Sequence, residues 1–413
     1  MCGVAGIVGR NIETTLIPHM IDRIKHRGPD YQGFYSSELI HLGHCRLAIN
    51  DLSERANQPF VSASHNIAIA VNGEIYNFRE LRKLLEDKGC RFISNSDSEV
   101  ILHGYIEYGL KLIDKLNGMF AICIWDGNKK EICLIRDRLG IKPLYYTVVD
   151  ECFLFSSEIK ALALHDGVDL CTDLQSFAEY LAFENYFANR TMNEKIKLVE
   201  PGEIVRFRLS DNTIEREYFW QPTFDCSRSD DEETLLEEYR SLIKSSVSRH
   251  MVGDVQLGCY LSSGIDSSSV AYFAAQEYKS QLKTFTGSFG MSGFYDEATG
   301  AAKTSQIFDY SNKRVEIRPY DFVNNIENIL WHLDEPRVGM GVFSQFMVAK
   351  TAAKDVRVIL TGHGGDELFA CYPVYKAIYG RDNFVRLALN SSPRELMFAC
   401  YFILFPKFRK EAG

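Results

Sequence analysis

The chain begins MCGVAGIVG, so a thiol stands at position 2, directly behind the first Met. If Met1 is removed, Cys2 becomes the first residue and carries both a thiol and a free α-amine. An α-amine has a reference pKa of about 7.7–8.0, so near neutral pH part of it is unprotonated and can accept the thiol proton. Cys2 would then be a nucleophile that carries its own general base.

Groups suited to attack on a carboxamide follow in four short stretches: KHRGPD at 25–30, HCRLAI at 44–49, VNGEIYN at 71–77 and SNSDSEV at 94–100. Asn72 and the backbone N–H of Gly73 could form an oxyanion hole, in which one donor contributes about 2.7–4 kcal/mol in comparable sites. Arg46 suits a carboxylate, and Glu74 with Asp97 suits an ammonium group. Each stretch alone could instead be a turn or a surface charge, since an Asn-Gly pair commonly closes a hairpin.

Together, the order and the residue types of these stretches resemble the class II, N-terminal-nucleophile glutaminase domain over roughly residues 1–205. The resemblance implies that Cys2 hydrolyses glutamine to glutamate and ammonia. Arg46 would bind the α-carboxylate of glutamine, and Glu74 with Asp97 would bind its α-ammonium group. The implied catalytic set is Cys2, Asn72 and Gly73, and the implied glutamine-binding set is Arg46, Leu47, Ile49, Asn72, Glu74 and Asp97.

A second motif, LSSGIDSSSVA at 261–271, follows a predicted strand and opens a predicted helix. A Ser- and Gly-rich turn at a helix N-terminus offers N–H groups and the positive end of the helix dipole, which suits pyrophosphate. Asp266 would repel phosphate unless a cation lies between them, which predicts Mg²⁺. The turn lacks the Lys and the length of a Walker A loop, which favours pyrophosphate release over γ-phosphoryl transfer. A plain Ser-rich helix cap is the alternative. The hydroxyl donors are Ser262, Ser263, Ser267 and Ser268.

A third motif, VILTGHGGDELFACY at 358–372, is again a predicted strand that runs into a Gly-rich turn with carboxylates. Thr361 and Gly362 would let a nucleotide approach the backbone closely. Asp366 could be a second Mg²⁺ ligand opposite Asp266, with Glu367 as its neighbour. The alternative is an ordinary turn followed by a helix cap.

The second motif looks like the SGGxDSS signature of ATP pyrophosphatases, with Ser263 where that group usually has its first Gly. In this order, the three blocks resemble the glutamine-hydrolysing asparagine synthetase family over nearly all of the chain. The resemblance implies a C-terminal domain that adenylates the side-chain carboxylate of aspartate with ATP and Mg²⁺. Ammonia, delivered through an internal tunnel, would then displace AMP. The implied ATP-binding set is Leu261, Ser262, Gly264, Asp266, Ser267, Gly287, Thr361 and Gly362, with Asp266 and Asp366 as metal ligands.

The chain departs from that family in two ways. The family commonly carries an acidic residue where this chain has His363, and an imidazole cannot reproduce a fixed negative charge. An acceptor other than aspartate, such as a sugar acid or a secondary-metabolite carboxylate, is therefore the first alternative. Family members also continue further, whereas this chain ends at Gly413, soon after an apolar run at 396–405. A fragment or an incomplete synthetase half is expected, and a glutaminase or scaffold with an inactive second domain is the second alternative.

The pattern of elements predicts two unlike halves. The first half reads as an N-terminal αββα Ntn-hydrolase sandwich, an α+β fold, with strands at 4–9, 39–49, 66–75, 118–126, 130–137 and 144–149. Two helices interrupt it, at 78–89 and 96–110, the second capped by Ser96 or Asp97. After Trp220, strands at 255–261, 283–289, 314–317 and 357–361 alternate with helices at 235–250, 268–278, 296–308, 321–333 and 344–354. That alternation predicts a doubly wound parallel sheet of the α/β class.

Composition agrees with two domains in 413 residues, which we place at 1–205 and 231–413 with a connecting strand and linker at 206–230. A net charge of −9 with mixed signs argues against nucleic acid or a membrane surface as a partner. The 11 Cys form no CxxC pair and no secretory signal precedes them, so we expect free thiols, no zinc site and a cytoplasmic protein. No apolar window reaches the roughly 18 residues of a membrane span. A homodimer is left open.

Overall fold

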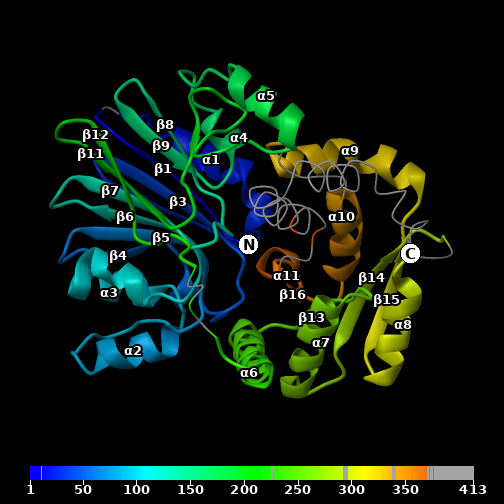
Figure 1. The fold of residues 1–413 in the computed structure, drawn as a ribbon. Coiled ribbons are helices and arrows are strands. Elements are labelled where there is room, and N and C mark those ends of the chain that lie inside the picture. Colours follow the sequence, from blue (N-terminus) through cyan, green and yellow to red (C-terminus); the bar gives the residue numbers. More distant parts are fainter. Residues whose placement is uncertain are drawn as a thin grey trace, which may run out of the picture.

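The computed structural model describes residues 1–369 apart from 11, 225, 226, 228, 292–295 and 337–340, together with residues 372 and 375. In its first half, two six-stranded antiparallel sheets are stacked face to face (Figure 1). The order of the first sheet is β10 (Lys197–Leu198), β8 (Tyr145–Val149), β9 (Cys152–Ser156), β1 (Gly3–Val8), β3 (Ile40–Arg46) and β2 (Tyr31–Ser36). The apolar run 396–405 lies outside the described residues.

The second sheet continues to residue 218, so the limit predicted at residue 205 falls inside one of its strands. Its order is β12 (Thr213–Tyr218), β11 (Glu203–Arg208), β7 (Glu131–Arg136), β6 (Gly118–Asp126), β5 (Ile67–Ile75) and β4 (Phe60–Ser62). Alternate side chains of both sheets meet in one buried layer, in which Phe153 of β9 stacks on Phe207 of β11 with ring centroids 4.8 Å apart. This layer holds β1 and β5 opposite each other.

Helices cover both outer faces, which confirms the αββα sandwich. The first sheet is covered by α1 (Leu16–Arg23) and α4 (Ile159–Leu162), and the second by α2 (Phe78–Glu86) and α3 (Glu99–Tyr108). A further helix, α5 (Leu174–Phe183), and 3₁₀ turns at Lys25–Arg27, Glu54–Ala56 and Gly109–Lys115 complete this half. The expectation of only two helices was therefore wrong. The predicted cap was wrong as well, because Ser98 is the N-cap of α3 and the Asp97 carboxylate instead accepts the N–H of Ile75.

The second half is built on a four-stranded parallel sheet, as predicted. Its order is β15 (Ser311–Glu316), β14 (Lys283–Ser288), β13 (Leu257–Tyr260) and β16 (Val358–Leu360). Apolar side chains of α6 (Glu232–His250), α7 (Ile265–Glu277) and α8 (Ala298–Ile307) pack on one face. Those of α10 (Gly341–Ala352) pack on the other, beside α9 (Pro319–Leu333), and the short α11 (Gly365–Leu368) follows β16. Helices on both faces make the sheet doubly wound.

Polar contacts join the two halves at several places. Arg357, just before β16, pairs with Asp30 of the first half. Lys160 in α4 pairs with Asp334 at the C-terminal end of α9 at 3.3 Å. Glu335 is buried and accepts hydrogen bonds from the Tyr186 hydroxyl and the Met192 N–H. The glutaminase-like sandwich and the parallel-sheet domain thus share an interface.

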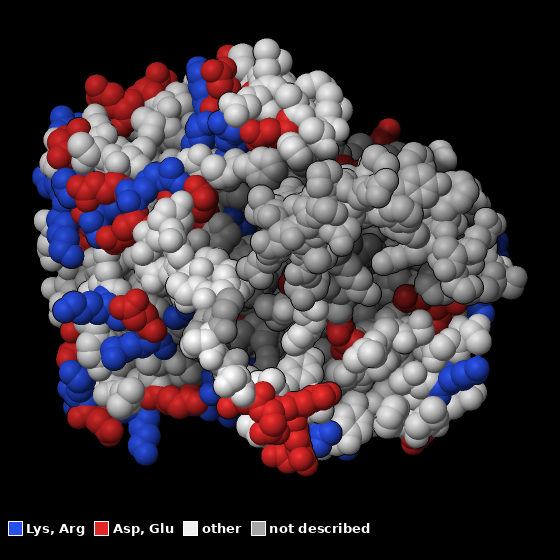
Figure 2. All heavy atoms as spheres, in the orientation of Figure 1, with Lys and Arg blue, Asp and Glu red and all other residues white. Residues whose placement is uncertain are grey.

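Charge is mixed over the face shown in Figure 2, where Lys and Arg alternate with Asp and Glu over the antiparallel sheets. Acidic residues gather at α6, whose first turn contains Glu232 and Glu233. Among the described helices, none combines the length and the apolar character that crossing a lipid bilayer requires.

Candidate active sites

Cys2 lies at the start of β1 beside the backbone of Leu47, which follows β3. Its Sγ accepts the Leu47 N–H at 3.4 Å and donates to the Leu47 carbonyl at 3.8 Å. Burial raises the pKa of the Cys2 thiol, while the nearby α-amine lowers it. Met1 still precedes Cys2, and burial lowers the pKa of the Met1 α-amine to about 6. Burial therefore disfavours the charged form of both groups.

Gly73 of β5 presents a backbone N–H that the sheet does not use. Opposite it, Phe120 of β6 donates its N–H to the Asp137 carboxylate at 3.1 Å and accepts the Asp137 N–H at 2.9 Å, both toward β7. Gly73 and Phe120 are therefore a non-hydrogen-bonded pair, and the Gly73 N–H points away from β6. On that side of β5, β4 pairs only as far as Ile69.

Asn72 adds a second free donor at the same point. It is fully buried, and neither polar atom of its side-chain amide has a hydrogen-bond partner among the described residues. The neighbouring N–H groups along this edge, those of Val71 and Ile75, donate to side chains at 2.7 Å. A buried amide without partners costs free energy unless a ligand pairs with it, which is consistent with the predicted role of Asn72 and Gly73 as oxyanion donors.

Glu74, which is half-buried, and Asp97, which is buried, form an acidic pair next to these donors. Side chains alternate along a strand, so Glu74 projects from the same face of β5 as Asn72. Burial and then the Asp97 carboxylate raise the pKa of Glu74 well above its usual value, and burial raises the pKa of Asp97 to about 6. Both carboxylates also raise the pKa of Cys2, which shows that they are close to it. Two carboxylates with raised pKa values suit an ammonium ligand.

Arg46 ends β3, and its guanidinium holds the following loop in place. It donates to the Ser53 carbonyl at 2.9 Å, to Asn57 Oδ1 at 2.8 Å and to the carbonyls of Asn50 and Asp51. The structure thus places Arg46 beside the predicted binding residues Leu47 and Ile49, with its Nη atoms engaged by the loop. A role in binding the α-carboxylate stays a prediction.

Three charged residues that sequence reasoning missed lie around Cys2. Arg27 donates from Nε to the Cys2 carbonyl at 3.0 Å and pairs with Glu158 at 2.8 Å. Burial alone would raise the pKa of Glu158, but hydrogen bonds from His26, Arg27 and Lys160 outweigh it and lower that pKa to about 2. Lys142 is buried, which lowers its pKa, while Glu74 acts in the opposite sense. Arg27 stands inside the quoted KHRGPD stretch, but nothing in that stretch indicates its distant partner.

The second predicted site lies where strand order reverses in the parallel sheet. From β13 the chain builds outward through β14 and β15 and then returns with β16 on the other side of β13. Ligands of doubly wound sheets bind at the carboxyl edge of such a switch point. The turns after β13 and β16 meet there, because a Cβ at Gly362 would come within 2.6 Å of the Ser267 nitrogen. The structure therefore brings the second and third motifs together.

Serine hydroxyls shape the turn after β13. The Ser262 and Ser267 Oγ atoms are 2.7 Å apart, and Ser262 Oγ accepts the Gly264 N–H at 3.0 Å. Gly264 is the N-cap of α7. Leu261 is buried, and both its backbone N–H and its carbonyl are already paired with β14 residues. The turn thus opens at the N-terminus of a 13-residue helix, as the phosphate prediction requires.

Asp266 lies directly over the turn that carries Asp366. A Cβ at Gly365 would come within 2.2 Å of Asp266 Oδ2. Burial, Asp366 and Glu367 all raise the pKa of Asp266. Converging carboxylate charge fits Mg²⁺, which usually binds one or two carboxylates together with phosphate oxygens. Among the described residues, no group of three or more His, Cys, Asp or Glu side chains is placed to hold a metal ion by itself.

Gly287 and His363 complete the predicted nucleotide set. Gly287 lies inside β14, where a Cβ would come within 3.2 Å of Val348 of α10, so apolar side chains cover it. His363 follows Thr361 at the turn after β16. Its Nδ1 lies 2.8 Å from Thr361 Oγ1 and its Nε2 lies 2.8 Å from Gln345 Nε2. Both ring nitrogens of His363 therefore have a polar partner within hydrogen-bond distance.

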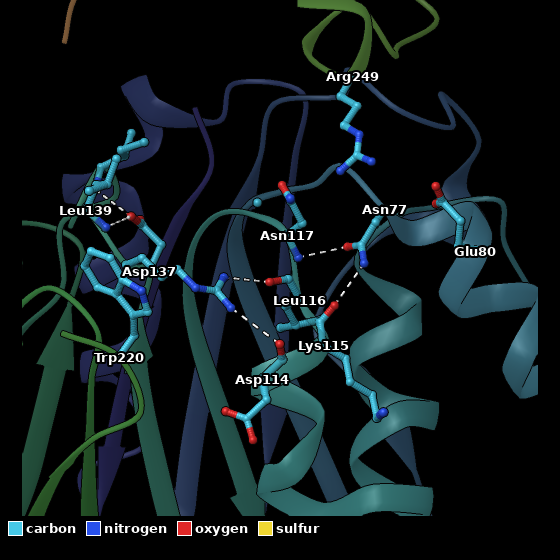
Figure 3. Close-up of a pocket in the computed structure, with 13 residues that line it drawn as sticks. Asn77, Glu80, Asp114, Lys115, Leu116, Asn117, Asp137, Leu139, Trp220 and Arg249 are labelled. Atoms are coloured by element: carbon cyan, nitrogen blue, oxygen red, sulfur yellow. Dashed lines mark hydrogen bonds between the residues drawn. The ribbon is translucent and has the colours of Figure 1, made fainter. Parts of the chain in front are cut away.

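A separate pocket of about 610 Å³ lies between the halves and is shown in Figure 3. Asn77 and Asn117 border it from the sandwich, Arg249 extends into it from α6, and Trp220 lies at its opposite end. None of the predicted glutamine- or nucleotide-binding residues lines it.

Comparison with known proteins places both halves in known families. Residues 1–220 match the family model described as "Glutamine amidotransferase domain", and residues 238–410 match the one described as "Asparagine synthase". A glutamine-hydrolysing asparagine synthetase of Bacillus subtilis is 36% identical over 382 residues, which cover 91% of this chain and 60% of the relative. The chain thus spans less than two thirds of that relative's length.

Two further relatives show how wide the similarity is. A Methanocaldococcus jannaschii protein of the same family name is 33% identical over 94% of this chain and 78% of its own length. "Amidase chyE" of Penicillium rubens is 31% identical over 87% of this chain and 55% of its own length. With both family models matched in order and relatives above 30% identity over most of its length, the chain belongs to the glutamine-hydrolysing asparagine synthetase family.

Proposed function

We propose that this chain is a glutamine-dependent amidotransferase that uses ATP to activate a carboxylate, with L-aspartate as acceptor and L-asparagine, AMP and diphosphate as products. The observation that carries the proposal is the buried Asn72 amide, which has no hydrogen-bond partner among the described residues, next to the Gly73 N–H, which points away from β6. The ligands of the chain would be glutamine, ATP and the acceptor carboxylate. A homodimer and a cytoplasmic location stay predictions.

In the first half-reaction, Cys2 attacks the carboxamide carbon of glutamine after its proton passes to a base. Once Met1 is removed, the α-amine of Cys2 is the nearest candidate for that base. The carbonyl oxygen becomes an oxyanion that Asn72 and Gly73 stabilise by hydrogen bonds. Ammonia leaves when the C–N bond breaks, and water then cleaves the thioester to give glutamate. Glu74 and Asp97 hold the α-ammonium group during both steps.

In the second half-reaction, the turn after β13 binds the phosphates of ATP at the N-terminus of α7. Asp266 and Asp366 would hold Mg²⁺, which offsets the negative charge of the departing diphosphate. The acceptor carboxylate displaces diphosphate from the α-phosphorus and forms an acyl-adenylate. Ammonia attacks the acyl carbon, the bond to AMP breaks, and the amide is released. Thr361 and Gly362 allow the nucleotide to approach the backbone.

A second candidate keeps both half-reactions but takes a sugar acid or a secondary-metabolite carboxylate as acceptor. His363 favours it, because an imidazole in contact with Thr361 and Gln345 stands where the family commonly carries an acid. A relative named as an amidase, at 31% identity, is consistent with a wider range of reactions in the family. An acceptor screen that follows diphosphate release separates the two candidates.

The test of the first half-reaction is a comparison of two cysteine variants. Cys2→Ala should abolish glutamate release from glutamine but leave any activity with free ammonia. Cys171→Ala is the matched control, since Cys171 is exposed and lies outside both sites. Intact mass should first establish that Met1 is absent, because a retained Met1 blocks the α-amine of Cys2. Glutamate release by Cys2→Ala at the parent rate would show that the nucleophile is another group.

A further inference from the structure

Asp51 ends the loop that follows Arg46 and has a backbone conformation that few residues adopt. Its φ of 53° lies in the left-handed region, which Asp tolerates better than most side chains. We call residues 47–51 the glutamine loop, since it contains the predicted binding residues Leu47 and Ile49. Its first residue also contacts the Cys2 thiol.

Asp51 connects both ends of the predicted glutamine pocket. Its carbonyl accepts a hydrogen bond from Arg46, the residue predicted to bind the α-carboxylate. Its Oδ2 accepts the N–H of Asn95 at 2.6 Å, two residues before the ammonium-binding Asp97. Its Oδ1 accepts the Ser53 N–H at 3.0 Å and so closes the loop on itself. A shift of Asp51 would therefore displace the groups at both ends of the substrate.

The synthetase-like half fixes the glutamine loop through the turn between α6 and β13. Asp254 in that turn accepts the Asp51 N–H at its Oδ2 at 2.9 Å. The Asp254 N–H donates to the Ile49 carbonyl, also at 2.9 Å. These two hydrogen bonds flank Asn50 and hold the loop from both sides. The left-handed turn at Asp51 is thus anchored by a residue of the other domain.

A second contact between the domains supports the same loop from its other end. Asp30 accepts the Ala48 N–H at 2.8 Å and pairs with Arg357. Arg357 directly precedes β16, the strand that leads into the nucleotide motif. The loop is therefore fastened to the parallel-sheet domain at the starts of β13 and β16, the two strands that form the predicted ATP site.

We propose that Asp254 and Asp51 are positioning residues for glutamine, so that the synthetase-like half sets how tightly the glutaminase-like half binds its substrate. This inference rests on the proposed function, because it takes the pocket around Cys2 to be a glutamine site. Neither residue touches the reacting atoms. Asp254 acts on the loop, and Asp51 passes its position on to Arg46 and to the segment of Asp97.

The test measures glutamine affinity by calorimetry in the full chain carrying Cys2→Ala, where binding is separated from chemistry. Asp254→Ala removes one hydrogen bond of ordinary strength, so we expect it to raise the Kd for glutamine about fivefold. Asp254→Asn should stay within about twofold of the parent, because the amide oxygen still accepts the Asp51 N–H. Asp51→Ala should weaken binding at least as much. The double variant Asp51→Ala/Asp254→Ala should lose less binding free energy than the two single variants lose in sum, because both residues act through one loop.

Arg249→Ala is the matched control, because Arg249 lies at the same domain interface and extends into the pocket of Figure 3 without a described hydrogen bond to the glutamine loop. It should bind glutamine like the parent. The inference is overturned if Asp254→Ala binds like the parent, even with a lower melting temperature, or if Asp254→Asn is as weak as Asp254→Ala. Lack of glutamate release by the Cys2-intact chain would instead count against the proposed function, and a parent that binds no glutamine would overturn both.

Discussion

At the scale of single residues, Asn72 offers the clearest separation of activity from stability. Its side-chain amide is buried and has no hydrogen-bond partner among the residues that the structure describes, so the folded chain gains little from it. Asn72→Ala should therefore lower kcat for glutamate release by about 10²–10³-fold, the effect of one lost oxyanion donor, with little change in KM or in melting temperature. Steady-state kinetics and thermal unfolding check this. Asn77→Ala, at the same end of the sandwich, is the control, and a parent-like kcat in Asn72→Ala would contradict the assignment.

Replacement of Asp97 should change both binding and stability, because its negative charge is needed to bind the ammonium group of glutamine but lowers the free energy of unfolding. Its pKa in the folded chain is about 6, above the reference of about 3.9. The loss of stability caused by burying the charged carboxylate is absent below about pH 4, where Asp97 is protonated in both the folded and the unfolded chain. It is complete above about pH 6. Asp97→Asn should therefore stabilise the chain by about 2 kcal/mol at pH 7 and by little at pH 4.

Denaturant unfolding of Asp97→Asn and the parent at both pH values measures that difference. Glutamine binding by the same variant should be weakened at pH 7, because the α-ammonium group loses one of its two carboxylates. A variant that is less stable than the parent at pH 7 would mean that Asp97 gains more from its hydrogen bonds than it loses by burial.

Sequence reasoning located most of the residues that converge on Cys2 but not those that support them. Asn72 and Glu74 share a face because they are two residues apart on one strand, which a short motif can reveal. Glu158 is 131 residues from its partner Arg27, and only the packing of β9 against β1 brings it near. The resemblance supplied the role of Arg46, but no motif shows that a loop already engages its guanidinium.

At the scale of elements, the turns after β13 and β16 depend on Gly365 for their contact. A Cβ there would meet Asp266 at 2.2 Å and push its carboxylate away. Gly365→Ala should therefore reduce ATP-dependent diphosphate release at least about tenfold while glutamate release continues, because the loss of positioned charge acts only at the second site. Gly341→Ala, where no described residue would come within 4 Å of the new Cβ, should behave like the parent. Equal losses in both variants would argue against an ATP site at these turns.

The prediction of helices from the sequence succeeded for α2 and failed for α5 and α1, for separate reasons. The helix α2 buries Phe78, Leu81 and Leu85 on one face, a spacing that sequence analysis recognises. The helix α5 has Leu174, Phe177 and Leu181 at helical spacing, which sequence analysis passed over, but these side chains are exposed and only Ser176 is buried, so the stripe does not face the core. By contrast, α1 does bury an apolar stripe, but Pro18 in its first turn resembles a breaker.

At the scale of the whole molecule, the contacts between the halves were beyond sequence reasoning, because each joins residues more than a hundred positions apart. Glu335 lies in the most buried of these contacts, where it accepts hydrogen bonds from the Tyr186 hydroxyl and the Met192 N–H. Glu335→Ala removes the acceptor of both hydrogen bonds and should lower the free energy of unfolding by about 2 kcal/mol. Thermal unfolding measures the loss. The exposed Glu316, paired with Arg318, is the control and should change little on Glu316→Ala. Unchanged stability of Glu335→Ala would mean that this interface contributes nothing.

We propose that ammonia made at Cys2 is used for an ATP-dependent amidation in the same chain. The most direct measurement supplies glutamine labelled with ¹⁵N in its amide as the sole nitrogen source, with ATP, Mg²⁺ and a panel of carboxylates that includes aspartate. It follows diphosphate, glutamate and labelled amide together. The account predicts equal amounts of all three with one acceptor, and none with Cys2→Ala. Glutamate release without diphosphate for every carboxylate would contradict it and leave a glutaminase with an inactive second domain.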